Sequence, residues 1–293
     1  MLQQTQVDRV LPKYHAFLAA FPNFAELAVA PTDAVIRAWA PLGYNQRAVR
    51  LQAIARVVMT EHEGQMPTTL DGLLALPGIG RYTAGAIACF AHGQAVATVD
   101  TNIRRVLTRI FIGDLSAEAA TTERADVALA LAEAALPPAA DRAYAWNQAL
   151  MDLGATVCLA RTPACERCPL TALCRTYAQM SEHTLFPSGT ALRELQAQRV
   201  AEAPADYAVK RARSATPAQP FKESNRYFRG RVVDALRALP TGEGITLAAL
   251  GPQVRPDYAD AEEAWLRRTV TGLVRDGLAA WADASETQVT LPR

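Results

Sequence analysis

Residues 76–106 read LPGIGRYTAGAIACFAHGQAVATVDTNIRRV, and this stretch decides how the rest of the chain is interpreted. The turn Pro77-Gly78-Ile79-Gly80 separates two helical patterns, over 69–76 and 82–91. Its glycines give the backbone freedom and leave no Cβ in the way of an approaching group. The second helix then begins with free backbone N–H groups, which bind anions such as a DNA phosphate. The pattern predicts a helix–hairpin–helix.

An acidic residue stands at the start of the next helical pattern. In Val99-Asp100-Thr101-Asn102, Asp100 occupies the N-cap position. A lone aspartate before a helix is most often a plain cap, and a lone PGxG turn is most often a corner between helices. Their occurrence together at this spacing favours a phosphate grip beside a reacting centre.

The composition limits the class of protein. The chain has 293 residues, half of them apolar, and a formal net charge of +1. A surface for nucleic acid must therefore be local rather than spread over the whole molecule. No apolar run approaches the length of a membrane span, and the first residues lack the layout of a signal peptide. We expect a cytoplasmic protein that makes no contact with membranes.

Apolar periodicity indicates a mostly α-helical chain, with no convincing strand before residue 156. We expect a helical core over 1–180, a linker over 181–219 rich in polar residues and proline, and a small α+β domain over 220–293. The last domain resembles a winged helix, with three helices and a terminal hairpin. Helices are expected over 1–22, 24–29, 31–39, 45–63, 117–135, 140–155, 227–239, 247–250 and 261–276, and the hairpin strands over 278–281 and 287–291.

Four of the five cysteines, Cys158, Cys165, Cys168 and Cys174, form the pattern C-x6-C-x2-C-x5-C. In a cytoplasmic protein such a cluster indicates a metal centre rather than disulfides. Zinc accepts four thiolates, and so does a [4Fe–4S] cluster. The spacing differs from the paired C-x2-C knuckles of zinc ribbons. Cys89 lies alone in an apolar helix and is expected to be a buried free thiol.

The segments LPGIG-R-YTA and VDTNIRRV resemble the helix–hairpin–helix DNA glycosylases of the endonuclease III superfamily. The resemblance implies a fold of two helical lobes with an iron–sulfur loop. The cysteine spacing matches the cluster loop of that superfamily, so it implies a [4Fe–4S] cluster over 158–174. The cluster would brace the loop and present Arg161, Arg167 or Arg175 to DNA phosphates.

Three further segments are similar to the adenine-specific (MutY-like) branch: MLQQTQV at 1–7, Leu42-Gly43-Tyr44, and WNQALMDLGA at 146–155. Tyr82 stands where the bifunctional lyases carry the lysine that forms a Schiff base. Because tyrosine cannot form an imine, we expect a monofunctional enzyme that removes a base without cutting the strand.

The resemblance implies a role for each matching position. A base must leave the helical stack before its glycosidic bond can be reached. Gln3, Gln4 and Tyr44 would wedge into the duplex, and Gln148 would line the pocket for the flipped adenine. Asp100 would stabilise positive charge on the sugar, as carboxylates do in glycosidases, and Asn102 would hold Asp100 or the sugar. Tyr82 completes the catalytic set, and the phosphate grip would comprise Pro77, Gly78, Gly80 and Thr83.

The chain departs from the branch in several places. The branch carries a glutamate that protonates the departing adenine two residues before the MLQQTQ signature, where this sequence begins. We therefore expect a start upstream of Met1. Asn45 and Thr101 replace a tyrosine and a glycine of the branch. Residues 220–293 are too few and too helical for the branch's C-terminal module, which resembles a nucleotide hydrolase.

The function expected is removal of adenine mispaired with 8-oxoguanine or guanine, by a monomer bound to mismatched double-stranded DNA and associated with the nucleoid. A thymine or uracil mismatch glycosylase also carries tyrosine at position 82. A non-catalytic mismatch-binding protein is the third reading. Between Arg193 and Arg237 there are ten Lys or Arg and five Asp or Glu. This excess fits a DNA-contacting segment or a solvated helix face equally well.

Overall fold

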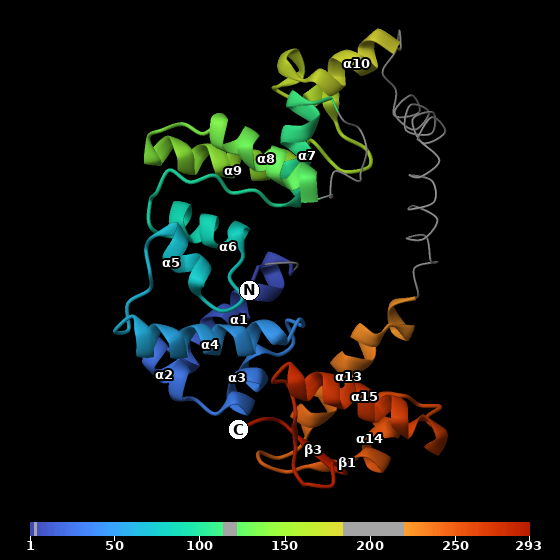
Figure 1. Ribbon diagram of the computed structural model, residues 1–293. Coiled ribbons are helices and arrows are strands. Elements are labelled where there is room, and N and C mark those ends of the chain that lie inside the picture. Colours follow the sequence, from blue (N-terminus) through green and yellow to red (C-terminus); the bar gives the residue numbers. More distant parts are fainter. Residues whose placement is uncertain (3–4, 114–121, 184–219) are drawn as a thin grey trace. The chain divides into compact units, whose positions relative to one another are not determined.

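The computed structural model describes residues 1–2, 5–113, 122–183 and 220–293 (Figure 1). The described part is mostly helical, as predicted. It divides into two compact units. The first holds the described residues within 1–67, 76–78 and 220–293, and the second those within 68–75 and 79–183. Most of the predicted linker 181–219 lies outside the described residues, so the predicted domain boundaries stay a prediction.

The first unit begins with four helices: α1 (Val7–Ala20), α2 (Phe24–Val29), α3 (Thr32–Trp39) and α4 (Gln46–Glu61). The first helix was predicted from residue 1, but it starts at Val7, because the backbone of Gln6 is extended. Asn23 caps α2 by accepting the N–H of Glu26 at 2.8 Å. The helices enclose a small core of apolar side chains, which includes Val10, Phe17, Leu27, Val35, Trp39 and Ala55.

Residues 220–293 form three helices and a three-stranded antiparallel sheet. The elements are α13 (Asn225–Ala238), β1 (Ile245–Thr246), α14 (Leu247–Val254), α15 (Glu263–Arg275), β2 (Ala280–Trp281) and β3 (Gln288–Thr290). The strands are ordered β1-β3-β2, with Val289 paired to Ile245 on one side and Trp281 on the other. Short single turns at Phe221–Glu223 and Asp260–Glu262 precede α13 and α15. This order is that of a winged helix, as predicted, and β1 is the element that the sequence did not reveal.

The helices of this C-terminal part share a core with two residues of the N-terminal helices in the same unit. Ile36 of α3 is fully buried in the cluster, and Val49 of α4 packs against it. Arg37 of α3 donates to the carbonyls of Leu239, at 2.9 Å, and Arg237. The other buried members come from α13, α14, α15 and the sheet: Val232, Val233, Leu236, Leu250, Leu266, Val270, Leu273 and Val289.

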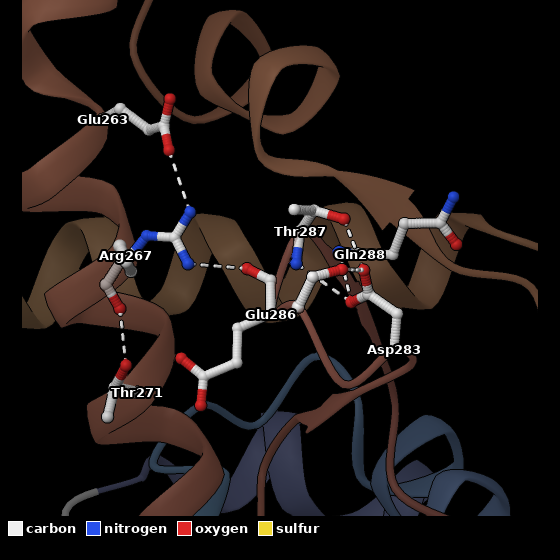
Figure 2. Close-up of polar contacts among 8 residues, drawn as sticks. Glu263, Arg267, Thr271, Asp283, Glu286, Thr287 and Gln288 are labelled. Carbon is white, nitrogen blue, oxygen red and sulfur yellow. Dashed lines mark hydrogen bonds and ion pairs between the residues drawn. The ribbon is translucent and has the colours of Figure 1, made fainter.

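A single carboxylate organises the turn between β2 and β3 (Figure 2). Asp283 accepts hydrogen bonds from the backbone N–H groups of Thr287 and Gln288, each at 2.9 Å, and from the hydroxyls of Ser285 and Thr287. Arg267 of α15 donates to the carbonyl of Glu286 at 2.8 Å, which fixes the turn to the helix. These bonds hold the ionised form and keep the pKa of Asp283 well below its usual range.

The second unit holds the two helices that flank the hairpin turn, the next helices and the cysteine loop. Its elements are α5 (Leu70–Ala75), α6 (Arg81–Ala86), a π-helical turn (Ile87–Ala91), α7 (Thr101–Phe111), α8 (Thr122–Ala134), α9 (Ala140–Thr156), single turns at Cys165–Arg167 and Thr171–Leu173, and α10 (Arg175–His183). Ile103, Val106 and Leu107 on one face of α7 are fully buried in its core. Throughout the described ranges, no helix is long and apolar enough to cross a bilayer.

Candidate active site and iron–sulfur loop

The turn between α5 and α6 has the left-handed backbone expected of a hairpin. Gly78 has a φ of +76°, a conformation that costs other residues free energy. A Cβ on Gly78 would stand 2.8 Å from Cδ of Arg50, whose side chain lies against it within the first unit. Gly80, the N-cap of α6, has an ordinary φ of −94°, and a Cβ there would meet nothing within 4 Å. The fold therefore requires glycine at position 78 but leaves room for a Cβ at position 80.

Asp100 is the N-cap of α7, as predicted. Its Oδ1 accepts the backbone N–H groups of Asn102, at 2.9 Å, and Ile103, at 2.7 Å. The second oxygen, Oδ2, accepts the side-chain amide of Asn102 at 3.2 Å. The carboxylate is half-buried, and both of its oxygens accept hydrogen bonds. Asn102 thus holds Asp100, which is one of the two roles expected of it.

Tyr82 of α6 lies within the electrostatic reach of Asp100. The Tyr82 side chain is half-buried. This burial, followed by the negative charge of Asp100, raises the pKa of the Tyr82 hydroxyl above its ordinary value. The phenol therefore stays neutral at physiological pH and remains able to donate a hydrogen bond. The second unit brings these two predicted catalytic residues together.

A buried asparagine that the sequence did not single out supports the segment before Asp100. Asn147 of α9 is buried, and its Oδ1 accepts both the backbone N–H and the hydroxyl of Thr98, each at 3.1 Å. Its amide donates to the carbonyl of Val96 at 2.9 Å and lies 3.3 Å from Sγ of Cys89. The polar residue in an otherwise apolar helical face was the signal that could have revealed it.

All four predicted cysteine ligands line one cavity of the second unit. Cys158, Cys165, Cys168 and Cys174 border it together with apolar side chains from α7, α9 and α10, among them Val106, Leu153 and Met180. Each of the four side chains is half-buried and forms no disulfide. Cys89 is separate from them and buried as a free thiol, as predicted.

The four sulfurs around this cavity are the ligands expected of either metal centre considered. A single zinc ion needs its thiolates within about 2.3 Å of one point. In the described part of the chain, no three His, Cys, Asp or Glu side chains are grouped closely enough to hold one ion. Four cysteines around a common cavity are the usual ligand set of a [4Fe–4S] cluster. Burial and the neighbouring thiols Cys158, Cys174 and Cys168 raise the pKa of Cys165 to about 11, so a thiolate there needs a metal cation beside it.

Two arginines of α7 fasten this loop to the helix that Asp100 caps. Arg109 is buried and donates to the carbonyls of Leu159, at 2.7 Å, and Ala160, at 2.9 Å, and its Nη1 lies 3.4 Å from Sγ of Cys158. Arg105 donates to the carbonyls of Cys158, at 2.9 Å, and Gly154, at 2.7 Å. Neither arginine was among the residues singled out from the sequence.

Tyr44, one of the three wedge residues expected from the resemblance, belongs to the first unit. Tyr44 lies in the loop between α3 and α4, with 38% of its surface exposed and a φ of +47°. Arg47 places its guanidinium over the Tyr44 ring, and donates to the carbonyl of Met1 at 2.9 Å and the hydroxyl of Thr5 at 3.1 Å. Gln3 and Gln4 lie outside the described residues.

The remaining predicted site residues have these positions. Gln148 is exposed on α9, where its amide donates to Asp152 at 3.1 Å. Pro77 lies in the hairpin turn and Thr83 in α6, and both are half-buried. Among the predicted site residues, the second unit brings Asp100, Asn102 and Tyr82 together at the start of α7, and the four cysteines around one cavity. The roles of Gln148, Pro77 and Thr83 stay predictions.

The fold and these two sites define a class of protein. Residues 1–129 match the family model described as the HhH-GPD superfamily base excision DNA repair protein, and residues 158–174 match the iron-sulfur binding domain of endonuclease III. A solved structure described as a thermostable thymine-DNA glycosylase is 32% identical, with a TM-score of 0.54 over 61% of this chain and 80% of that one. The cavity of four cysteines is accordingly an iron–sulfur site that holds a [4Fe–4S] cluster.

Comparison with individual relatives narrows the class. The adenine DNA glycosylase of Mycolicibacterium smegmatis is 38% identical over 98% of this chain and 86% of its own length. The human adenine DNA glycosylase is 43% identical over 65% of this chain, which is 34% of the human protein. The chain belongs to the adenine DNA glycosylase family of base-excision repair enzymes.

Proposed function

We propose that this protein removes adenine paired with 8-oxoguanine or guanine by hydrolysing the bond between the base and its sugar. One observation carries the proposal. The carboxylate of Asp100 is fixed through both oxygens at the entrance to α7, and a neutral Tyr82 lies beside it. A fixed carboxylate stabilises positive charge that develops on a sugar as its base departs.

The roles of the other residues follow from this chemistry. Tyr82 has no amine that could form an imine with the sugar, so a water molecule adds to the sugar carbon as the bond to adenine breaks. The departing adenine gains one proton and the water loses one, and the strand stays intact. Asn102 keeps the carboxylate oriented while the duplex is bound. Pro77, Gly78, Gly80 and Thr83 would grip a phosphate of the distorted strand, and Gln148 would line the adenine pocket.

The wedge is proposed to come from the first unit. Tyr44 presents a part-exposed ring, and Arg47 connects its loop to Met1 and Thr5, which flank Gln3 and Gln4. Side chains that enter the base stack occupy the space of the extruded nucleotide and so stabilise its flipped form. We also propose a division into a core over 1–180 and a C-terminal domain over 220–293, in a monomer acting on chromosomal DNA.

The [4Fe–4S] cluster has a structural role in this proposal. When bound, the cluster supplies cross-links among the four cysteines and does not act on the sugar. Arg105 and Arg109 then hold the loop against α7, so that the exposed Arg161, Arg167 and Arg175 are available to phosphates.

The test is a panel of duplexes that differ in one base pair. Adenine opposite 8-oxoguanine, adenine opposite guanine, thymine opposite guanine, uracil opposite guanine and a fully paired control are compared for binding and for base release. The proposal predicts the tightest binding and the fastest release for adenine opposite 8-oxoguanine. Preferential release of thymine or uracil would favour the mismatch-glycosylase reading, to which the solved thymine-DNA glycosylase gives some support. Binding preference with no release of any base would favour the non-catalytic reading.

A further inference from the structure

A row of alternating rings and guanidinium groups runs through the first unit from α3 to α15. Arg47 lies 5.4 Å from the ring centre of Trp39 and 5.2 Å from that of Tyr44. The guanidinium of Arg226, from α13, also lies over the Tyr44 ring, 4.0 Å from its centre. Arg226 is also 5.7 Å from the ring centre of Phe221. Edge-on ring contacts continue the row through Phe221, Tyr227, Phe228 and Trp265.

Helix α13 also contacts Asn45, the residue that follows Tyr44. Arg237 of α13 donates from Nη2 to Oδ1 of Asn45 at 2.6 Å. Arg226 and Arg237 are eleven residues apart and therefore share one face of the helix, since three turns of an α-helix take about 10.8 residues. This face of α13 thus contacts two consecutive residues of the loop before α4. The replacement of tyrosine by Asn45 supplies the acceptor for this second contact.

The conformation of Tyr44 needs stabilising contacts from other residues, because its backbone torsion is unfavourable. A φ of +47° is an uncommon conformation for a residue with a side chain, and such conformations persist only where the surroundings impose them. The guanidinium groups of Arg47 and Arg226 both approach the π system of the exposed ring, which attracts cations. A ring that is already oriented loses less conformational entropy when it enters a base stack than a freely rotating one.

We propose that Arg226 is a positioning residue for the DNA wedge Tyr44, through which the C-terminal domain takes part in lesion recognition. The inference rests on the proposed function, because it takes Tyr44 as the wedge. It assigns a role to Arg226, one of the basic residues between Arg193 and Arg237 whose excess fits a DNA contact and a solvated helix face equally well. In this proposal, Arg226 acts on the distorted base step of a mismatched duplex indirectly, by orienting Tyr44, and does not contact a DNA phosphate.

The test compares the binding of a duplex containing adenine opposite 8-oxoguanine with that of a fully paired duplex. We expect Arg226→Ala to weaken binding of the lesion duplex about fivefold, within the range of one cation–π contact, and to leave the paired duplex unchanged. Arg226→Lys keeps the charge but loses the planar stacking, so a smaller loss of about twofold is expected. Arg268→Ala, an exposed arginine on α15 of the same domain, is the matched control and should alter neither affinity.

A double-mutant cycle separates positioning from a direct phosphate contact. If Arg226 acts through the ring, Arg226→Ala has no further effect in a Tyr44→Ala background, and the salt dependence of binding is unchanged. An equal loss in both backgrounds, with a salt slope lower by about one, would show a phosphate contact and overturn the inference. Equal losses for Arg226→Ala and Arg268→Ala would also overturn it.

The binding comparison distinguishes a failure of the proposed function from a failure of this inference. If the unmodified protein binds the lesion duplex no more tightly than the paired one, the proposed function is wrong, and the inference falls with it. If the unmodified protein prefers the lesion and Arg226→Ala keeps the full preference, only the inference is wrong. Urea unfolding of each variant checks that the free energy of unfolding is preserved.

Discussion

Nη1 of Arg105 lies 2.9 Å from Oδ1 of Asn102, and this contact joins the cysteine loop to the carboxylate of Asp100. On one side, Arg105 holds the carbonyls of Cys158 and Gly154. On the other side, Asn102 donates its amide to Oδ2 of Asp100. One arginine thus fixes both the start of the iron–sulfur loop and the amide that orients the proposed catalytic group.

Replacing Arg105 by lysine tests this connection. A lysine amine is a compact donor and cannot reproduce the planar fork that reaches Asn102, Gly154 and Cys158. We expect the single-turnover rate of adenine release to fall by between about tenfold and a hundredfold, as small misplacements of a catalytic group do. The absorbance of the cluster should be unchanged. The neighbouring variant Arg104→Lys is the control, and an equal loss there would remove the special role of Arg105.

Arg109 should control how well the protein keeps its iron. Its guanidinium is buried and satisfies the carbonyls of Leu159 and Ala160. Arg109→Met leaves both acceptors without a donor, which costs about 3 kcal/mol of stability. We expect less iron per protein and weaker brown absorbance at about 400 nm. Arg161→Ala, in the same loop but exposed, should keep full iron content. Normal iron in Arg109→Met would mean that the cysteines alone hold the loop.

The two glycines of the hairpin should respond differently to alanine. Gly78→Ala requires a left-handed alanine and displaces Arg50, so we expect a loss of about 1–2 kcal/mol in the free energy of unfolding. Gly80→Ala has an ordinary φ and open space, so stability should be unchanged. If a phosphate approaches this turn, Gly80→Ala still weakens the binding of every duplex, whatever its base pair. Urea unfolding and binding to paired DNA separate the two effects.

The hydrogen bonds to Asp283 should make the free energy of unfolding depend on pH. The pKa of Asp283 is depressed in the folded protein by bonds from Thr287, Gln288 and Ser285. Its contribution is therefore present above the unfolded pKa of about 3.9 and is lost as the pH falls toward the folded value. We expect Asp283→Ala to unfold at lower urea concentration at pH 7, as followed by the fluorescence of Trp265 and Trp281. The difference from the unmodified protein should shrink below pH 4. An equal decrease in the urea concentration of unfolding for Glu243→Ala, a variant of an exposed carboxylate, would exclude a specific role of the turn.

The features that sequence could predict are those encoded within short segments. The hairpin at 76–80, the N-cap at Asp100 and the cysteine pattern each depend on residues a few positions apart, and all three are found in the structure. Strand β1 could not be predicted, since its two residues, Ile245 and Thr246, are too few to show alternation and are defined only by pairing with β3.

Contacts between distant residues explain the other omissions. Asn147 and Thr98 are 49 positions apart, and Arg226 and Tyr44 are 182 apart, so neither partner carries a local signal for the other. A buried asparagine or a stacked arginine is recognised only when tertiary packing supplies its partner. The start of α1 was wrong for a related reason, because apolar periodicity does not show that the backbone at Gln6 is extended.

Asp100→Asn provides the most direct measurement. Asparagine caps helices as well as aspartate does, so its side-chain oxygen keeps the bonds to Asn102 and Ile103 while the charge is removed. The rate of adenine release from a duplex with adenine opposite 8-oxoguanine is measured under single-turnover conditions, in the chain together with any residues encoded before Met1. We predict unchanged mismatch binding and unfolding, with release abolished. Release at the unmodified rate would contradict the role of Asp100 and with it the proposed mechanism.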